Sequence, residues 1–298
     1  FLYPAMPFLS YHGMSQADSD AIFAYLQTQQ PVARKIPANT LPFPFNQRWT
    51  LAYWRLVNPP IRLKDDPTAL AGAYIANVLG HCQECHTPRN FMGGLIQSRA
   101  YQGARLGRIT APSLTPEALA QRGWTLQDIQ SFLKTGMAPQ GTMTLEMYPV
   151  LLHSSQYMQD ADVAALTAYL GKGRLPQMPV KTPAEPDRPA IGQAAGRDVY
   201  VAVCGGCHGL NGEGKPHIAP AMKGNTSPML TDPSNLIHVI LNGVAEQRMA
   251  NGEVMQAMPG FRSALSAQQV ADLVNYMRNV WGGQPADITS ADIERTEQ

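Results

Sequence analysis

The chain has 298 residues, 44% of them apolar and 15% charged, a length that predicts two or three globular domains and a composition that excludes a disordered chain. Lysine and arginine total 23 against 22 aspartates and glutamates, so there is no broad basic field and no nucleic acid is expected as a partner. No apolar run reaches the roughly 18 residues that a membrane-spanning helix needs, so any membrane contact is expected to be peripheral.

The chain opens on a methionine loop followed by a helical pattern. Met6 lies between two prolines, and residues 14–26 read as an amphipathic helix. The same combination recurs twice further along. We therefore expect residues 1–30 to be the end of an earlier repeat unit, with the rest of that unit upstream of the given sequence.

Residues 46–57 contain two tryptophans, a tyrosine and two arginines in a pattern that fits an amphipathic helix. Such a helix can lie on a membrane surface or against a partner subunit, or it can pack within its own chain. The pattern alone leaves these interpretations open.

All four cysteines fall in two motifs, Cys82-Gln83-Glu84-Cys85-His86 and Cys204-Gly205-Gly206-Cys207-His208. In the spacing C-x-x-C-H, two thiols can add to the vinyl groups of one haem while the histidine ligates its iron. Zinc binding and thiol redox chemistry are the alternatives for a C-x-x-C pair. The motifs lie far apart for one shared zinc site, and little β pattern supports a thioredoxin-like fold, so covalent haem is favoured at both.

Both motifs lie in the same order of predicted elements. The order is an entry helix, the motif, a middle helix that ends at a glycine, a methionine loop, and a closing helix with Ser or Asp at its start. The predicted helices span residues 66–79, 125–136 and 160–170 around the first motif, and 192–201, 232–243 and 266–277 around the second. This order is typical of small all-α c-type cytochrome domains.

The methionine loops supply candidate axial thioethers, Met147 in the first unit and Met258 in the second. The neighbouring methionines compete with them: Met255 with Met258, and Met137, Met143 and Met158 with Met147. Five histidines without a repeated position are interpreted as surface or core residues, with a bis-histidine haem as the alternative: His12, His81, His153, His217 and His238. Arg89 fits either a haem propionate or a solvated loop.

On these motifs the chain resembles the multihaem cytochrome c subunits of membrane-bound periplasmic dehydrogenases of acetic acid bacteria. The most specific stretches are residues 3–7, 41–49 and 80–90 and the Met258 loop, and the resemblance covers nearly the whole chain. It implies an all-α fold of tandem class I cytochrome c domains joined by Pro-rich linkers. The expected boundaries are a first-domain remnant over 1–30, a linker over 31–64, a second domain over 65–173, a Pro-rich linker over 174–190, a third domain over 191–283 and a tail over 284–298.

The resemblance also implies a set of haem-binding residues. It implies three haems per subunit; two attachment motifs are present, so two haem c groups are expected here and a third in the intact protein. The implied attachment residues and proximal ligands are Cys82, Cys85 and His86, and Cys204, Cys207 and His208. The implied distal ligands are Met147 and Met258, with Met6 serving the first haem, and the carbonyls of Pro112 and Pro220 would orient the two imidazoles.

The function that the resemblance implies is electron relay without a substrate-oxidising site in this chain. Electrons would pass from a periplasmic dehydrogenase subunit to ubiquinone or a terminal oxidase at the inner membrane. Residues 43–46 and 84–90 favour a molybdopterin and iron–sulfur aldehyde dehydrogenase as the donor, over a quinoprotein alcohol dehydrogenase or a flavin-dependent gluconate or sugar dehydrogenase. A dihaem cytochrome c peroxidase with one open haem and a free soluble shuttle are the rival interpretations.

Overall fold

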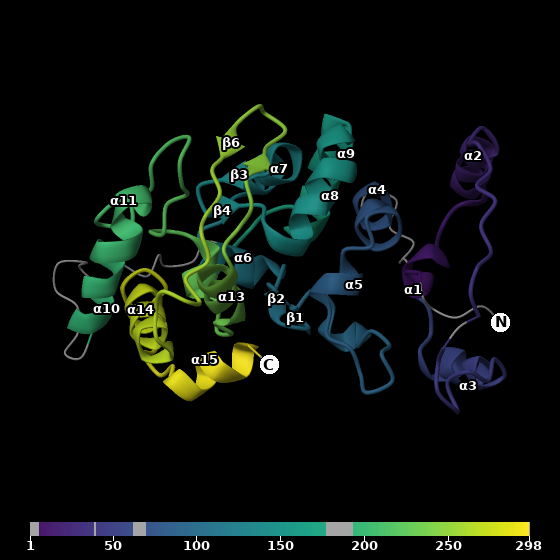
Figure 1. Cartoon of the computed structure of the whole chain (residues 1–298). Coiled ribbons are helices and arrows are strands. Elements are labelled where there is room, and N and C mark those ends of the chain that lie inside the picture. The colour runs from purple at the N-terminus through teal and green to yellow at the C-terminus, as the bar shows by residue number, and fades with distance from the viewer. Residues whose placement is uncertain (1–5, 39, 62–69, 177–192, 298) are drawn as a thin grey trace.

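A computed structural model describes residues 6–38, 40–61, 70–176 and 193–297. Figure 1 shows three groups of helices in chain order, an N-terminal group, a middle group and a C-terminal group. Most of the predicted Pro-rich linker over 174–190 lies outside the described residues, as do the first residues of the helix predicted over 66–79. Within the described residues, no helix is both long and apolar enough to cross a bilayer.

The N-terminal group consists of α1 (Phe8–Tyr11), α2 (Gln16–Gln27) and α3 (Thr50–Val57). The helix predicted over 14–26 is confirmed by α2, which begins after Ser15 because that hydroxyl accepts the backbone N–H of Asp18 at 3.1 Å. No residue of α2 is buried. In α3 the indole of Trp54 donates to the carbonyl of Met92 at 2.8 Å, so this helix packs within its own chain on one side.

The middle group begins with α4 (Leu70–Tyr74), a π-helical turn η1 (Ile75–Leu79) and the motif helix α5 (Gln83–His86). Its later elements are β1 (Ala104–Leu106), β2 (Ile109–Ala111), α6 (Pro116–Gln121), α7 (Leu126–Thr135), β3 (Met137–Ala138), β4 (Gly141–Thr142), α8 (Tyr148–His153) and α9 (Asp160–Leu170). Short 3₁₀ turns cover Gln97–Arg99, Leu145–Met147 and Ser155–Tyr157. The predicted helices over 125–136 and 160–170 are confirmed.

The glycine end predicted for the helix over 125–136 is confirmed, and the cap predicted for the helix over 160–170 is wrong. Thr125 and Asp128 form a capping box at the start of α7, and Gly136 ends it with φ +81°. At α9 the expected Asp cap is wrong, because the cap position is Gln159 and Asp160 is the first helical residue.

The C-terminal group repeats this order. It contains α10 (Ala194–Val199), a π-helical turn η5 (Tyr200–Cys204), α11 (Gly205–His208), α12 (Thr226–Met229), α13 (Ser234–Asn242), β5 (Gln247–Arg248), β6 (Val254–Met255), α14 (Ala267–Val280) and α15 (Ser290–Glu297). A capping box of Ser266 and Gln269 begins α14, which confirms the helix predicted from residue 266. The predicted tail contains α15, whose Ile293 is buried in the core of this group.

Two features depart from the all-α prediction. Each entry helix ends in a π-helical turn that leads into the motif, and a single wide turn leaves no trace in hydrophobic periodicity. Three antiparallel hairpins, β1–β2, β3–β4 and β5–β6, lie between the helices. Strands of two or three residues are too short to show the alternation that identifies a strand in a sequence.

The first and last helices of the middle and C-terminal groups cross in the same way. A Cβ atom added to Gly72 of α4 would lie 2.1 Å from the carbonyl oxygen of Ala165 in α9, and one added to Gly196 of α10 would lie 2.1 Å from that of Asp272 in α14. Such a close approach of two backbones requires glycine. Each group is therefore assembled around its own helix crossing, and the two crossings are of the same kind.

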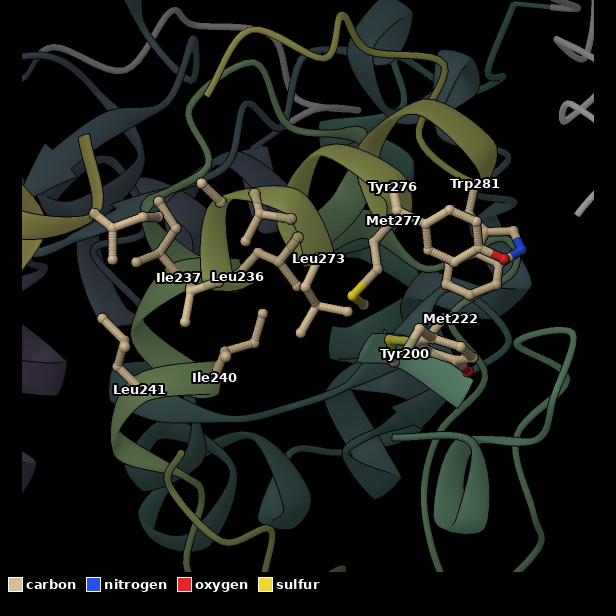
Figure 2. Packing of buried hydrophobic residues seen from close by; sticks show 14 of the residues in the cluster. Tyr200, Met222, Leu236, Ile237, Ile240, Leu241, Leu273, Tyr276, Met277 and Trp281 are labelled. Atoms are coloured by element: carbon tan, nitrogen blue, oxygen red, sulfur yellow. The ribbon is translucent and has the colours of Figure 1, made fainter. Parts of the chain in front are cut away.

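The C-terminal core lies between α13 and α14, as Figure 2 shows. Leucines and isoleucines of α13 face Leu273 of α14, and three aromatic rings close the end nearest the motif. The ring of Trp281 lies 4.8 Å from that of Tyr200 and 5.4 Å from that of Tyr276, centroid to centroid. This core supports the second motif, because Cys204 packs against it.

Candidate haem sites

The first motif lies on one tight turn. The backbone N–H of Cys82 donates to Ala76 in the π-helical turn at 2.9 Å, and that of His86 donates to Cys82 at 3.0 Å. The two thiols are free, with Cys85 exposed and Cys82 partly buried. Both sulfurs and the imidazole are thereby presented by a single turn.

The imidazole of His86 is held in one orientation by a backbone carbonyl. The residue is 6% exposed, and its Nδ1 lies 2.7 Å from the carbonyl oxygen of Pro112. A carbonyl only accepts, so in the neutral ring Nδ1 carries the proton and Nε2 keeps a lone pair. Burial lowers the pKa of His86, despite the opposing effect of the hydrogen bond, which favours the neutral ring that can ligate a metal.

The second motif repeats this arrangement. Nδ1 of His208 lies 2.9 Å from the carbonyl oxygen of Pro220, and burial lowers the pKa of His208. The hydroxyl of Tyr200 donates to the carbonyl of Gly209 at 2.8 Å and ties the motif to the C-terminal core. Both histidine–proline contacts that the resemblance implies are thus present.

The thiols do not resemble those of a disulfide oxidoreductase. Burial raises the pKa of Cys82 and that of Cys204 to about 11 each. A redox-active thiol is activated by a lowered pKa, so neither residue has that character. Among the described residues, no group of three or more histidine, cysteine and acidic side chains is placed to bind a metal ion, so no zinc site is formed there.

Met258 lies close to the second motif's supporting core. Its backbone pairs with Val244, with N–H to O distances of 2.8 and 2.9 Å, and its side chain packs against the same cluster as Cys204. Its competitor Met255 is buried in a different cluster, together with Met143 and Met249. This difference separates the two methionines, and the axial role of Met258 stays a prediction.

Met147 ends a 3₁₀ turn and packs, partly buried, against the cluster that contains Met143 and Leu151. Its competitor Met158 packs against the cluster around Tyr101, which Cys82 also touches. The backbone carbonyl of Met158 accepts from Nζ of Lys134 at 2.6 Å. Met147 and Met158 thus lie against different clusters, and the axial role of Met147 stays a prediction.

The contacts of the remaining candidates are with other residues than the two motif histidines. Met6 is 68% exposed at the start of the described chain. Arg89 donates to the Glu84 carboxylate at 2.6 Å and to the Gly93 carbonyl at 2.7 Å, so it closes the loop after the first motif. His217 pairs with Glu253 at 2.7 Å.

A buried polar network beside the first motif is not predicted by the motif or its spacing. The hydroxyl of Tyr101 donates to Oδ1 of Asn77 at 2.6 Å, Gln83 donates to the same atom at 2.5 Å, and Asn77 donates to the hydroxyl of Tyr169 at 3.0 Å. Burial raises the pKa of Tyr101, which keeps this phenol protonated as a donor. A polar Asn77 inside the apolar stretch of an entry helix was the available signal.

The residues at both motifs fit a covalently attached haem. Each motif offers two unpaired thiols on the turn that carries the histidine, and each histidine has Nδ1 occupied by a carbonyl and Nε2 unprotonated. The pattern defines a c-type cytochrome site, and residues 193–281 match the cytochrome c family.

Relatives extend this classification over the whole chain. The chain is 33% identical over 323 residues to the cytochrome c subunit of a quinone alcohol dehydrogenase from Gluconacetobacter polyoxogenes. The match covers 99% of this chain and 68% of that protein. The chain is also 31% identical to the fructose dehydrogenase cytochrome subunit of Gluconobacter japonicus, covering 99% and 67%, and 31% identical to the gluconate 2-dehydrogenase cytochrome c subunit of Pantoea cypripedii, covering 98% and 72%. The chain belongs to the family of dehydrogenase cytochrome c subunits.

Proposed function

We propose that this chain relays electrons within a dehydrogenase complex through two haem c groups, one at each motif, held in tandem class I cytochrome c domains over residues 65–173 and 191–283. The observation that carries the proposal is the repeated pair of histidine–proline hydrogen bonds, at 2.7 Å for His86 and 2.9 Å for His208. An imidazole held in this way has its tautomer and orientation fixed for an axial iron bond.

Each residue has a definite task in this proposal. Cys82, Cys85 and His86 hold one haem, and Cys204, Cys207 and His208 hold the other. Met147 and Met258 supply sulfur ligands to these two haems, and Met6 is the sulfur ligand proposed for a third haem. When bound, the haem supplies reversible one-electron chemistry at iron. The imidazoles and the soft thioethers would ligate its iron, keep substrate away from it and favour its reduced state.

The proposed donor is a catalytic dehydrogenase subunit in the periplasm, and the acceptor is ubiquinone or a terminal oxidase at the inner membrane. Residues 43–46 and 84–90 favour a molybdopterin and iron–sulfur aldehyde dehydrogenase. The relatives support two other kinds of donor equally, because they are subunits of a quinone alcohol dehydrogenase and of fructose and gluconate dehydrogenases.

The experiment is anaerobic reduction of the native complex, extracted from membranes with detergent. Aldehyde, alcohol, fructose and gluconate are added separately while haem absorbance is recorded. We expect one substrate to reduce both haems, and the identity of that substrate and of the copurified subunit assigns the donor. Isolation of the chain without a dehydrogenase, or turnover of peroxide at one haem, would contradict the proposal in favour of a free shuttle or a peroxidase.

A further inference from the structure

The C-terminal group holds the strand that leads to the Pro112 carbonyl. Asn235 of α13 accepts the backbone N–H of Thr110 at its Oδ1, 2.7 Å away, and donates from Nδ2 to the Thr110 carbonyl at 2.8 Å. Thr110 lies in β2, two residues before Pro112. Figure 1 shows α13 beside this hairpin. One side chain of the C-terminal group thus satisfies both backbone polar groups of Thr110.

A second residue reinforces this contact. The hydroxyl of Thr110 donates to Oδ2 of Asp232 at 2.7 Å, and Nη1 of Arg105 in β1 lies 3.6 Å from the same carboxylate oxygen. Asp232 is itself fixed by the backbone N–H of Ser234 at 2.9 Å. The β1–β2 hairpin of the middle group is therefore fastened to the start of α13.

The C-terminal group also contacts the chain directly beside Met147. The hydroxyl of Tyr148 accepts the backbone N–H of Arg248 at 2.8 Å and donates to the Arg248 carbonyl at 3.0 Å. Tyr148 follows Met147 directly, and Arg248 lies in β5. Met249 and Met255 of the same hairpin pack against Leu151 in α8. A phenol bound to both polar groups of one residue fixes the position of its own backbone.

We propose that Asn235 and Tyr148 are positioning residues through which the C-terminal group sets both axial ligands of the haem at His86. The inference rests on the proposed function, because it takes His86 and Met147 as those ligands. Asn235 acts on His86 through β2 and Pro112, and Tyr148 acts on Met147 through the adjoining backbone. The reduction potential of the His86 haem is then controlled from the C-terminal group, which holds the other haem. Asn235 is part of that group, and Tyr148 binds to it.

Loss of the Asn235 contact and loss of the Tyr148 contact shift the reduction potential of the His86 haem in opposite directions. A strong hydrogen bond at Nδ1 makes the imidazole a more basic ligand, which favours oxidised iron. Asn235→Ala loosens β2 and weakens that bond, so the potential of the His86 haem rises. Tyr148→Phe releases the Met147 loop and weakens the sulfur bond that favours reduced iron, so the potential of the same haem falls.

The test is a spectroelectrochemical titration of the full-length holoprotein in a Met258→His background, whose second haem has a lowered potential and is resolved from the first. We expect Asn235→Ala to raise the potential of the His86 haem, Tyr148→Phe to lower it and weaken its methionine–iron absorption band, and the second haem to titrate unchanged. Matched controls are Asn279→Ala, which removes an amide that donates to the carbonyl of Gln284 in its own group, and Tyr157→Phe at a residue that is 74% exposed.

The outcomes separate failure of the inference from failure of the proposed function. The inference is wrong if the His86 haem has the same reduction potential in Asn235→Ala and Tyr148→Phe as in the controls. That result would still leave two one-electron steps, and the proposed function would stand. Absence of those steps from the parent protein would overturn the proposed function itself. If Asn235→Ala does not fold, Asn235→Asp keeps the acceptor for Thr110 and loses the donor; an unchanged potential in that variant overturns the inference equally.

Discussion

Gly196 of α10 lies directly against the backbone of Asp272 in α14, so that a Cβ atom on the glycine would lie 2.1 Å from the Asp272 carbonyl oxygen. This contact brings the entry helix of the second motif onto the closing helix of its group. Gly72 of α4 meets Ala165 of α9 in the same way, so each motif is supported by a helix crossing of the same kind.

The first prediction concerns this crossing. Gly196→Ala is expected to lower the free energy of unfolding of the C-terminal group by about 1–3 kcal/mol, because the new methyl group forces two packed backbones apart. Urea unfolding of the holoprotein followed by circular dichroism measures the change. Ala195→Ser on the exposed face of the same helix is the control and should stay within about 0.5 kcal/mol. Equal effects of the two substitutions would show that the crossing tolerates a side chain.

The second prediction separates Met258 from Met255. Met258→Leu removes an axial sulfur, so the potential of one haem falls and that of the other stays the same. Met255→Leu replaces a methionine in the buried cluster around Met249 by a side chain of similar volume, and it should leave both reduction potentials unchanged. A redox titration of the two variants measures this. An unchanged titration for Met258→Leu removes Met258 from the proposed ligands.

The third prediction separates Met147 from Met158, which pack against different clusters. Met147→Leu should abolish the methionine–iron absorption band of the haem at His86, and Met158→Leu should preserve it, because only Met147 is proposed to bind the iron. The near-infrared spectrum of each oxidised variant records the band. Loss of the band in Met158→Leu alone would transfer the axial role to Met158.

The fourth prediction concerns acid. Burial alone would raise the pKa of Asp232, but hydrogen bonds from Ser234 and Thr110 and the charge of Arg105 together lower it below its ordinary value of 3.8. A lowered pKa means that Asp232 stabilises the folded chain fully above its ordinary pKa and loses this contribution as the pH falls through the lowered one. Unfolding stability measured below about pH 4 should therefore fall less steeply in Asp232→Asn than in the parent.

The exposed carboxylate of Glu117 provides the control for that experiment, since Glu117→Gln removes one charge without touching the hairpin between β1 and β2. If the free energy of unfolding falls equally steeply with acid in the parent protein and in Asp232→Asn, the carboxylate contributes nothing to the contact between α13 and β2.

Local signals in the sequence predicted much of the fold and little of the contact between its groups. The starts predicted at residues 125 and 266 agree with those of α7 and α14, because the polar atoms that cap these helices at Thr125 and Ser266 bond within three residues. The cap at Asp160 was wrong because a neighbouring Gln159 takes that position without any side-chain bond.

At the candidate sites, the cysteines, histidines and prolines were identifiable because spacing and family resemblance mark them. The pairing of Asn235 with Thr110 joins residues 125 positions apart, and that of Tyr148 with Arg248 joins residues 100 positions apart. Neither pair belongs to a local pattern or a motif. Such contacts depend on how two helical groups dock, which periodicity within each group does not encode.

We propose that both motifs bind haem with a histidine and a methionine as ligands, so that the chain carries electrons and does not transform substrate. A potentiometric titration of the purified full-length protein, with absorbance recorded across the haem and near-infrared bands, is the decisive measurement for this proposal. We expect two one-electron steps and a methionine–iron band from each oxidised haem. A single haem, or a second haem that lacks the band and turns over peroxide, would contradict it.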